Sequence, residues 1–201
     1  MPLQNRVDPF GKIHAVPDRG LFMGNRGGCF HRPDQTLKPR NWASRQWIIC
    51  LLEFKGRKRL LMQPALYTEL FFLDEAAALA AGHRPCFECR RDAAKAFRGA
   101  LALPAPVRVA DLDARIAGEV QSVLKGQSAR ETLDPASLPD GAFFASGGTA
   151  FLKQGQTGRP WSFGGYGAPT PLPPQATRLT PQATCTALAA GYRPVLHATA
   201  A

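Results

Sequence analysis

The sequence predicts an α+β fold, with an N-terminal part built from a β-hairpin and short helices and a smaller α+β C-terminal part packed against it. Hydrophobic residues make up 45% of the chain and charged residues 20%, as is typical of globular proteins. The 19 glycines and 18 prolines indicate many turns, and therefore short strands and helices. Apolar and aromatic runs are interspersed with alanine-rich segments, so both strands and helices are expected.

The sequence also indicates where the protein resides. Its longest uncharged apolar run lies near Trp47–Leu52, far below the ~18 residues that a membrane-spanning helix needs. The first ten residues contain no apolar segment of the kind found in secretion signals. We therefore expect a cytoplasmic protein with no membrane partner.

Three apolar runs predict the strands of the N-terminal part. Arg45–Phe54 is a continuous apolar strand candidate, and Lys58–Met62 is expected to return as its hairpin partner after a short turn. Thr68–Leu73 is expected to form a third strand. Residues 1–20 contain three prolines and two glycines, which indicates an extended arm rich in turns.

Two helices are predicted in the same part. Asp74–Ala81 begins with acidic residues, is rich in alanine and is followed by Gly82, which matches the preferences for the two ends of a short helix. Cys86–Arg98 is expected to begin another helix.

A proline-broken segment at 99–109 is the expected linker between an N-terminal region, residues 1–98, and a C-terminal region, residues 110–201. The second region is expected to contain an amphipathic helix, a β-hairpin around two glycines and a final helix. These elements are Asp111–Leu124, Phe143–Ala145 with Thr149–Lys153, and a helix that starts at Thr180 and ends at Gly191.

The cysteines indicate a metal site in the N-terminal part. Five cysteines without a secretion signal favour reduced thiols over disulfides. Cys86 and Cys89 are spaced so that both can bind one ion, and Zn²⁺ prefers four such ligands in a tetrahedron. Cys29 and His31 follow a glycine-rich turn and are the predicted second pair. Together the four residues would form a closed, structural zinc site.

The sequence leaves the identity of the fourth ligand open. His83 lies three residues before Cys86, and Cys50 lies within an apolar run, so either is an alternative to a member of the upstream pair. A thioredoxin-type redox pair is another interpretation of Cys86 and Cys89, but a helix and a turn precede this motif rather than a buried strand. Core cysteines that bind no metal are a further alternative.

The segment Leu70–Arg91, LFFLDEAAALAAGHRPCFECRR, combines an aromatic strand, an alanine-rich helix, a glycine cap and the pattern Gly-x-Arg-Pro-Cys-x-x-Cys. It resembles the second half of the Ada-type zinc-binding domain of the Ada DNA-repair family, and the region covered is residues 22–98. The resemblance implies bound zinc and a DNA partner. The repair members of that family supply the upstream ligands in a Cys-x-x-x-Cys arrangement, whereas this chain offers Cys29 and His31.

The Ada resemblance also implies a reaction. In the repair members, one zinc-bound cysteine accepts a methyl group from alkylated DNA phosphate. Cys29 is the candidate acceptor in this chain, since the cysteines of a Cys-x-x-Cys motif more often hold the ion. The motifs of conventional hydrolases, Gly-x-Ser-x-Gly and His-Glu-x-x-His, are not present in the sequence.

The charge of the chain favours a nucleic-acid partner. The net charge is +10, and residues 1–98 hold 17 of the 25 lysines and arginines. Such an excess attracts polyanions. The side chains expected to meet phosphates are Arg26, Arg32, Lys55, Arg57, Lys58, Arg59, Arg90 and Arg91.

The sequence thus predicts a zinc-binding protein that contacts nucleic acid, with DNA as the expected partner, in DNA repair or its regulation. Two alternatives remain open. One is a structural zinc module that mediates protein interactions, and the other is the methyl acceptor described above.

Overall fold

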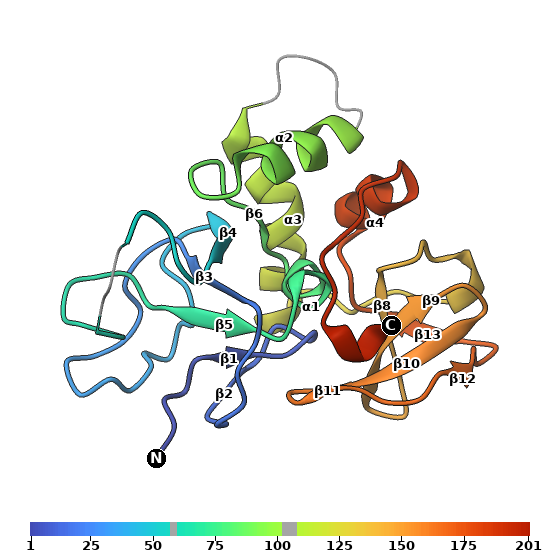
Figure 1. Ribbon diagram of the computed structural model, residues 1–201, viewed down its shortest axis with the longest axis horizontal. Coiled ribbons are helices and arrows are strands. Elements are labelled where there is room, and N and C mark those ends of the chain that lie inside the picture. Colours follow the sequence, from blue (N-terminus) through green and yellow to red (C-terminus); the bar gives the residue numbers. More distant parts are fainter. Residues whose placement is uncertain (57–59, 102–107) are drawn as a thin grey trace.

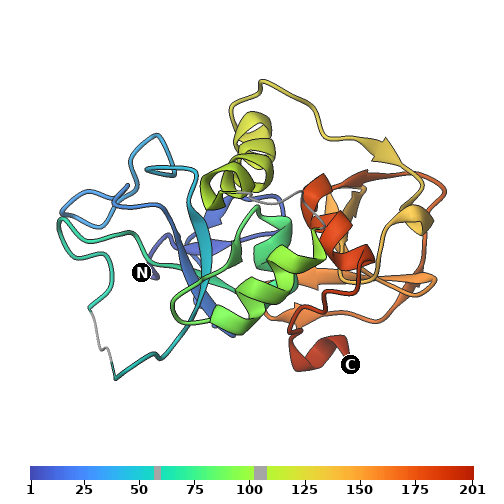
Figure 2. The same cartoon turned by 90° about the horizontal axis from the view of Figure 1, so that it is seen from above.

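A computed structural model describes residues 1–56, 60–101 and 108–201 and shows a mixed α+β fold (Figure 1). These residues form two β-sheets and four α-helices, so the predicted α+β class is confirmed. The sheets lie on opposite sides of the molecule, and the helices lie along the middle between them (Figures 1 and 2). None of the helices in these ranges has the length and apolar character that a membrane crossing requires.

The first sheet has six strands in the order β2-β1-β5-β3-β4-β6. Their bounds are β1 Arg6–Val7, β2 Ile13–His14, β3 Phe22–Arg26, β4 Trp47–Leu51, β5 Leu70–Phe72 and β6 Arg84–Pro85. The predicted strands at 45–54 and 68–73 are therefore confirmed as β4 and β5. The expected N-terminal arm contributes β1 and β2, because its short extended segments pair with each other and with β5.

The predicted hairpin partner of β4 is wrong. β4 pairs with β3 in an antiparallel manner and with β6 in a parallel manner. Of the predicted partner, Lys58 and Arg59 lie outside the described residues, and residues 60–62 are not in a strand, with Leu61 and Met62 in a turn. Met62 has a φ of 52°, which a strand does not accommodate, and its backbone N–H donates to the Glu69 carboxylate at 2.8 Å.

The central strands of the first sheet have two different faces. Buried and half-buried residues alternate along β3, β4 and β5. The buried face carries Phe22, Gly24, Arg26, Trp47, Ile49, Leu70 and Phe72. The half-buried face carries Met23, Asn25, Ile48, Cys50 and Phe71. Because successive side chains of a strand point to opposite faces, the first set belongs to the core and the second is available to line a site.

The second sheet follows the order β11-β10-β9-β8-β13-β7, with β12 paired to β10. Its strands are β7 Thr132–Leu133, β8 Phe143–Ser146, β9 Thr149–Gln154, β10 Thr157–Ser162, β11 Gly165–Tyr166, β12 Thr170–Pro171 and β13 Ala176–Arg178. The predicted hairpin around Gly147 and Gly148 is confirmed, since β8 pairs with β9 across these two residues and both have positive φ.

Helix α1, Glu75–Ala80, is formed as the sequence predicts. The Asp74 carboxylate caps it by accepting the Ala77 N–H at 2.9 Å, and Gly82 follows it with a φ of 84°. All six residues of the helix are buried. The Asp74 carboxylate also accepts the Tyr166 hydroxyl at 2.7 Å, so the start of α1 is tied to the second sheet.

The remaining helices are α2 Arg91–Ala100, α3 Val109–Leu124 and α4 Gln182–Ala189, with 3₁₀ turns at Pro135–Ser137 and Ala198–Ala200. α2 begins later than predicted, because the residues from Cys86 to Arg90 form the turn that precedes it. α3 buries three residues of the apolar stripe expected of it, with Leu112, Ile116 and Val120 each 1% exposed, whereas Val123, the fourth, is half-buried. The linker segment 102–107 lies outside the described residues.

The two predicted regions share a hydrophobic core. Phe22, Ile49 and Phe97 of the first region belong to the same buried cluster as Leu112 and Phe144 of the second. Burial of apolar surface between them therefore stabilises both regions together.

A buried ionic network joins α1 to the C-terminal end of the chain. Glu75 is 1% exposed and accepts two hydrogen bonds from the Arg90 guanidinium, at 2.9 and 2.8 Å. The Tyr192 hydroxyl and the Val195 backbone N–H donate to the same carboxylate. Because Arg90 directly follows Cys89, this network also anchors the turn that carries the paired cysteines.

Glu75→Gln is expected to lower the free energy of unfolding by about 3 kcal/mol, because the Arg90 charge then lies in the interior without its counter-charge. Urea denaturation followed by tryptophan fluorescence measures the change. Asp111→Asn is the matched control, since it breaks an ion pair with Arg108 on the surface and should leave stability unchanged. Equal losses in the two variants would show that the buried network has no special importance.

Candidate metal centre

The pairing of β4 with β6 brings two of the cysteines together. Ile49 lies opposite Pro85 in this parallel ladder, so the next residues along the two strands are Cys50 and Cys86. The Cys86 N–H donates to the Ile49 carbonyl at 3.0 Å, which continues the ladder to the cysteine itself. Neighbouring strands are about 4.8 Å apart, so this register places the two side chains next to each other.

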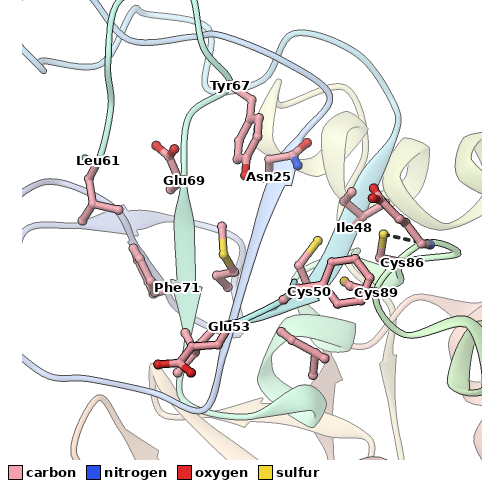
Figure 3. A pocket seen from close by; sticks show the side chains of 15 residues that line it. Asn25, Ile48, Cys50, Glu53, Leu61, Tyr67, Glu69, Phe71, Cys86 and Cys89 are labelled. Carbon is pink, nitrogen blue, oxygen red and sulfur yellow. Dashed lines mark hydrogen bonds between the residues drawn. The ribbon is translucent and has the colours of Figure 1, made fainter. Parts of the chain in front are cut away.

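A tight turn between β6 and α2 brings in the third cysteine. The Cys86 carbonyl accepts the Arg90 N–H at 3.1 Å, and the Cys86 sulfur accepts the Glu88 N–H at 3.3 Å (Figure 3). These bonds fold the Cys86-x-x-Cys89 segment back on itself. The turn leads directly into α2, whose N-terminal end favours negatively charged groups such as thiolates.

The sulfur atoms of Cys50, Cys86 and Cys89 all lie within 4.8 Å of one another. In a tetrahedral zinc–thiolate site with Zn–S bonds of about 2.3 Å, the sulfurs lie about 3.8 Å apart. The three thiols therefore have the spacing needed to hold a metal ion. Thiolate ligands favour soft or borderline metals such as Zn²⁺ and Cu⁺ over Mg²⁺ or Ca²⁺.

The three thiols also affect one another's ionisation. The pKa of Cys86 is lowered to about 2, mainly because the thiols of Cys50 and Cys89 donate hydrogen bonds to its sulfur, with further help from backbone N–H groups. The pKa of Cys50 is raised, because its thiol hydrogen-bonds to Cys86 and Cys89 and because partial burial disfavours the charged form. One thiolate in this cluster is thus stabilised by its two neighbours.

A cavity of about 400 Å³ lies beside the three thiols, which form part of its wall (Figure 3). Its floor is the half-buried face of the first sheet. Phe71, Met23 and Cys50 lie opposite one another across β5, β3 and β4, and Asn25 and Ile48 form the next row. The segment between β4 and β5 supplies further walls. The lining from that segment includes Leu52, Glu53, Phe54, Leu61, Tyr67 and Glu69.

The cavity combines apolar walls with acidic groups. Glu53, Glu69 and Glu88 line it, and the lining residues that the structure describes include no lysine, arginine or histidine. The nearby cations of Arg6 and Lys55 contact the Phe71 and Phe54 rings of the wall. The polar groups of the described lining residues themselves are therefore mainly carboxylates and thiols. This composition favours neutral or positively charged groups over phosphates.

The predicted set of four metal ligands is not assembled as such. Cys86 and Cys89 belong to the cluster, and Cys50, left open as an alternative, is the third member. Cys29 and His31 lie outside it, although their side chains approach each other at 3.8 Å. Cys29 lies three residues beyond Arg26, the last residue of β3. Cys50 pairs with Met23, near the opposite end of that strand.

His31 and His83 both make hydrogen bonds within the protein instead. The two ring nitrogens of His31 lie 2.8 Å from the Thr68 hydroxyl and 3.1 Å from the Gln63 carbonyl. His83 is completely buried and bonds to the Ala78 carbonyl at 3.2 Å. Both histidines thus have structural partners. Methyl transfer to Cys29 through a bound ion has no support here, because Cys29 is not among the clustered thiols.

Two of the side chains expected to meet phosphates are unavailable for that role. Arg26 is fully buried, stacks on the Trp47 ring at 3.9 Å and donates to the Gly11 carbonyl at 2.9 Å. Arg90 is held by Glu75. Of the others, Arg32, Lys55 and Arg91 are exposed, whereas Arg57, Lys58 and Arg59 lie outside the described residues.

Comparison with known proteins gives no further guidance. No protein-family model matches the chain, and no curated protein or solved structure matches it either. The resemblance to the Ada-type domain therefore stays a prediction, and the function has to be inferred from the site itself.

Cys50→Ser is expected to weaken metal binding by on the order of 100-fold, because it removes one of the three clustered thiolates. Competition between the protein and a chromophoric chelator for Zn²⁺ measures the change. Cys29→Ser is the matched control and should leave the affinity unaltered. If Cys29→Ser weakened binding as much as Cys50→Ser, Cys29 would be a metal ligand, as the sequence predicted.

Proposed function

We propose that this protein binds Zn²⁺ through Cys50, Cys86 and Cys89 and offers the fourth coordination position of the ion to a small molecule in the adjoining cavity. The observation that carries this proposal is the convergence of three sulfurs, within 4.8 Å of one another, in the wall of a cavity of about 400 Å³. Structural zinc sites have four protein ligands, whereas sites that act on a ligand keep one position open.

The surroundings of the thiols support a ligand site. A cavity of this size is within the range that binds small molecules, roughly 300–1,000 Å³. Zinc held by three thiolates would supply a Lewis acid and lower the pKa of a bound water or thiol. The chain's own contribution is to fix the sulfurs through the sheet register and the Glu88 N–H, and to limit water with walls such as Phe54 and Phe71.

The test of this proposal is metal analysis followed by replacement with Co²⁺, whose visible spectrum reports its ligands. We expect one zinc ion per chain. Addition of 2-mercaptoethanol to the Co²⁺ protein should intensify and shift the sulfur-to-metal charge-transfer band, because an outside thiol then occupies the fourth position. A spectrum that no added thiol alters would indicate a closed four-ligand site, and a chain that binds no metal would overturn the proposal.

Nucleic-acid contact is a second candidate function, on a surface separate from the cavity. The net charge of +10 favours it, as do the exposed side chains of Arg32, Lys55 and Arg91. The acidic lining of the cavity disfavours entry of phosphates, so the contact would involve the outer surface. DNA repair, as implied by the Ada resemblance, would be one setting for such contact.

Double-stranded DNA is expected to bind with an affinity that falls as salt rises, because phosphate contacts release counterions. Fluorescence anisotropy at several salt concentrations measures this. The double substitution Lys55→Ala and Arg91→Ala should reduce the slope of log K against log salt by about 2. Arg108→Ala with Arg115→Ala, two exposed positions at α3, is the control of equal charge. Salt-independent binding would contradict nucleic-acid contact.

A further inference from the structure

We propose that the ligand of the cavity is a small organic amine, whose protonated nitrogen pairs with Glu69 while its other end lies at the cluster of Cys50, Cys86 and Cys89. This inference deepens the proposed function. The part that concerns the thiol cluster rests on the proposal that Zn²⁺ is bound there. The side that binds the cation rests on Glu69 and on the composition of the cavity.

Glu69 is the first observation. It is 1% exposed and lines the cavity, on the side away from the thiols (Figure 3). One carboxylate oxygen accepts the Met62 N–H at 2.8 Å. The other oxygen is buried and has no hydrogen-bond partner among the residues that the structure describes. A buried acceptor without a partner is costly, and a ligand N–H would remove that cost.

The charged groups of the lining determine whether the cavity favours a cationic or an anionic ligand. Glu53 lines the cavity together with Glu69, and the lining residues that the structure describes include no basic side chain. Three thiolates around one Zn²⁺ would add a further net negative charge. A carboxylate or phosphate would therefore be repelled, whereas an ammonium group would be attracted.

The rest of the lining favours an apolar body. Phe71 and Met23 form the floor, and Phe54, Leu61 and Tyr67 lie in the walls. The rings of Phe71 and Phe54 already contact the cations of Arg6 and Lys55. Apolar surface stabilises alkyl or aryl groups, so an amine with a hydrocarbon or aromatic body matches this lining.

The sheet register gives the length of this ligand. Leu70 pairs with Gly24, so Glu69 is in line with Asn25, two residues along β3 from the position that pairs with Cys50. Two strand spacings and two residues correspond to about 12 Å between the backbones of Glu69 and Cys50. Side chains shorten this span, so a chain of a few carbons or a single ring can reach from the carboxylate to the thiols.

The experiment compares two probes that share a thiol for the metal and differ only at the far end. The probes are 6-aminohexane-1-thiol and 6-mercaptohexanoate, titrated into the metal-loaded protein by calorimetry. We expect the amine to bind at least about tenfold more tightly, because it forms a charge-assisted bond with Glu69. Glu69→Gln should remove this preference, whereas Glu131→Gln, an equal charge change in the second half of the chain, should preserve it.

The outcomes separate this inference from the zinc proposal. One bound metal ion with equal affinity for both probes would overturn the amine inference and leave the zinc proposal standing. If the chain binds no metal, the zinc proposal fails, and hexylamine then tests Glu69 alone. Hexylamine binding that Glu69→Gln weakens supports the amine site, and no such binding overturns it. Should Glu69→Gln fail to fold, the comparison of the two probes on the unchanged protein still decides.

Discussion

The short parallel ladder between β4 and β6 is the interaction on which the site depends. Only two residue pairs form it, and the bond from the Cys86 N–H to the Ile49 carbonyl extends it. A shift of this register by one residue would turn Cys50 to the opposite face of β4, into the core. The cluster of three thiols thus exists because two segments more than thirty residues apart are aligned to within one residue.

The same sheet separates two environments. On one face, Arg26 stacks on Trp47 and the aromatic residues join the core; on the other, thiols, carboxylates and apolar side chains surround a cavity. Arg26 is fully buried on the core face, and this burial lowers its pKa to about 9. The same strands therefore stabilise the fold and shape the site. Because successive side chains point to opposite faces, the core residues and the cavity residues lie on different sides of the sheet.

Local patterns predicted much of this structure. The cap at Asp74, the glycine after α1, the hairpin at Gly147 and the apolar stripe of α3 are formed as expected, because each depends on neighbouring residues. The choice of Cys50 over Cys29 was not determined by the sequence. It depends on the pairing of β6, a strand too short to show any periodicity. The alternation of Ile48 and Cys50 with buried residues places both on the half-buried face of β4. It does not identify Cys86 as the neighbour of Cys50 unless the partner strand is known.

The ionic network around Glu75 links the cysteine turn to a segment far away in the sequence. Arg90, next to Cys89, is held by a carboxylate whose other donors come from Tyr192 and Val195. More than a hundred residues of sequence separate Cys89 from Tyr192 and Val195. The contacts that hold the cysteine turn in place therefore form only when these distant parts of the chain have folded together, and unfolding of the segment around Tyr192 would release the turn.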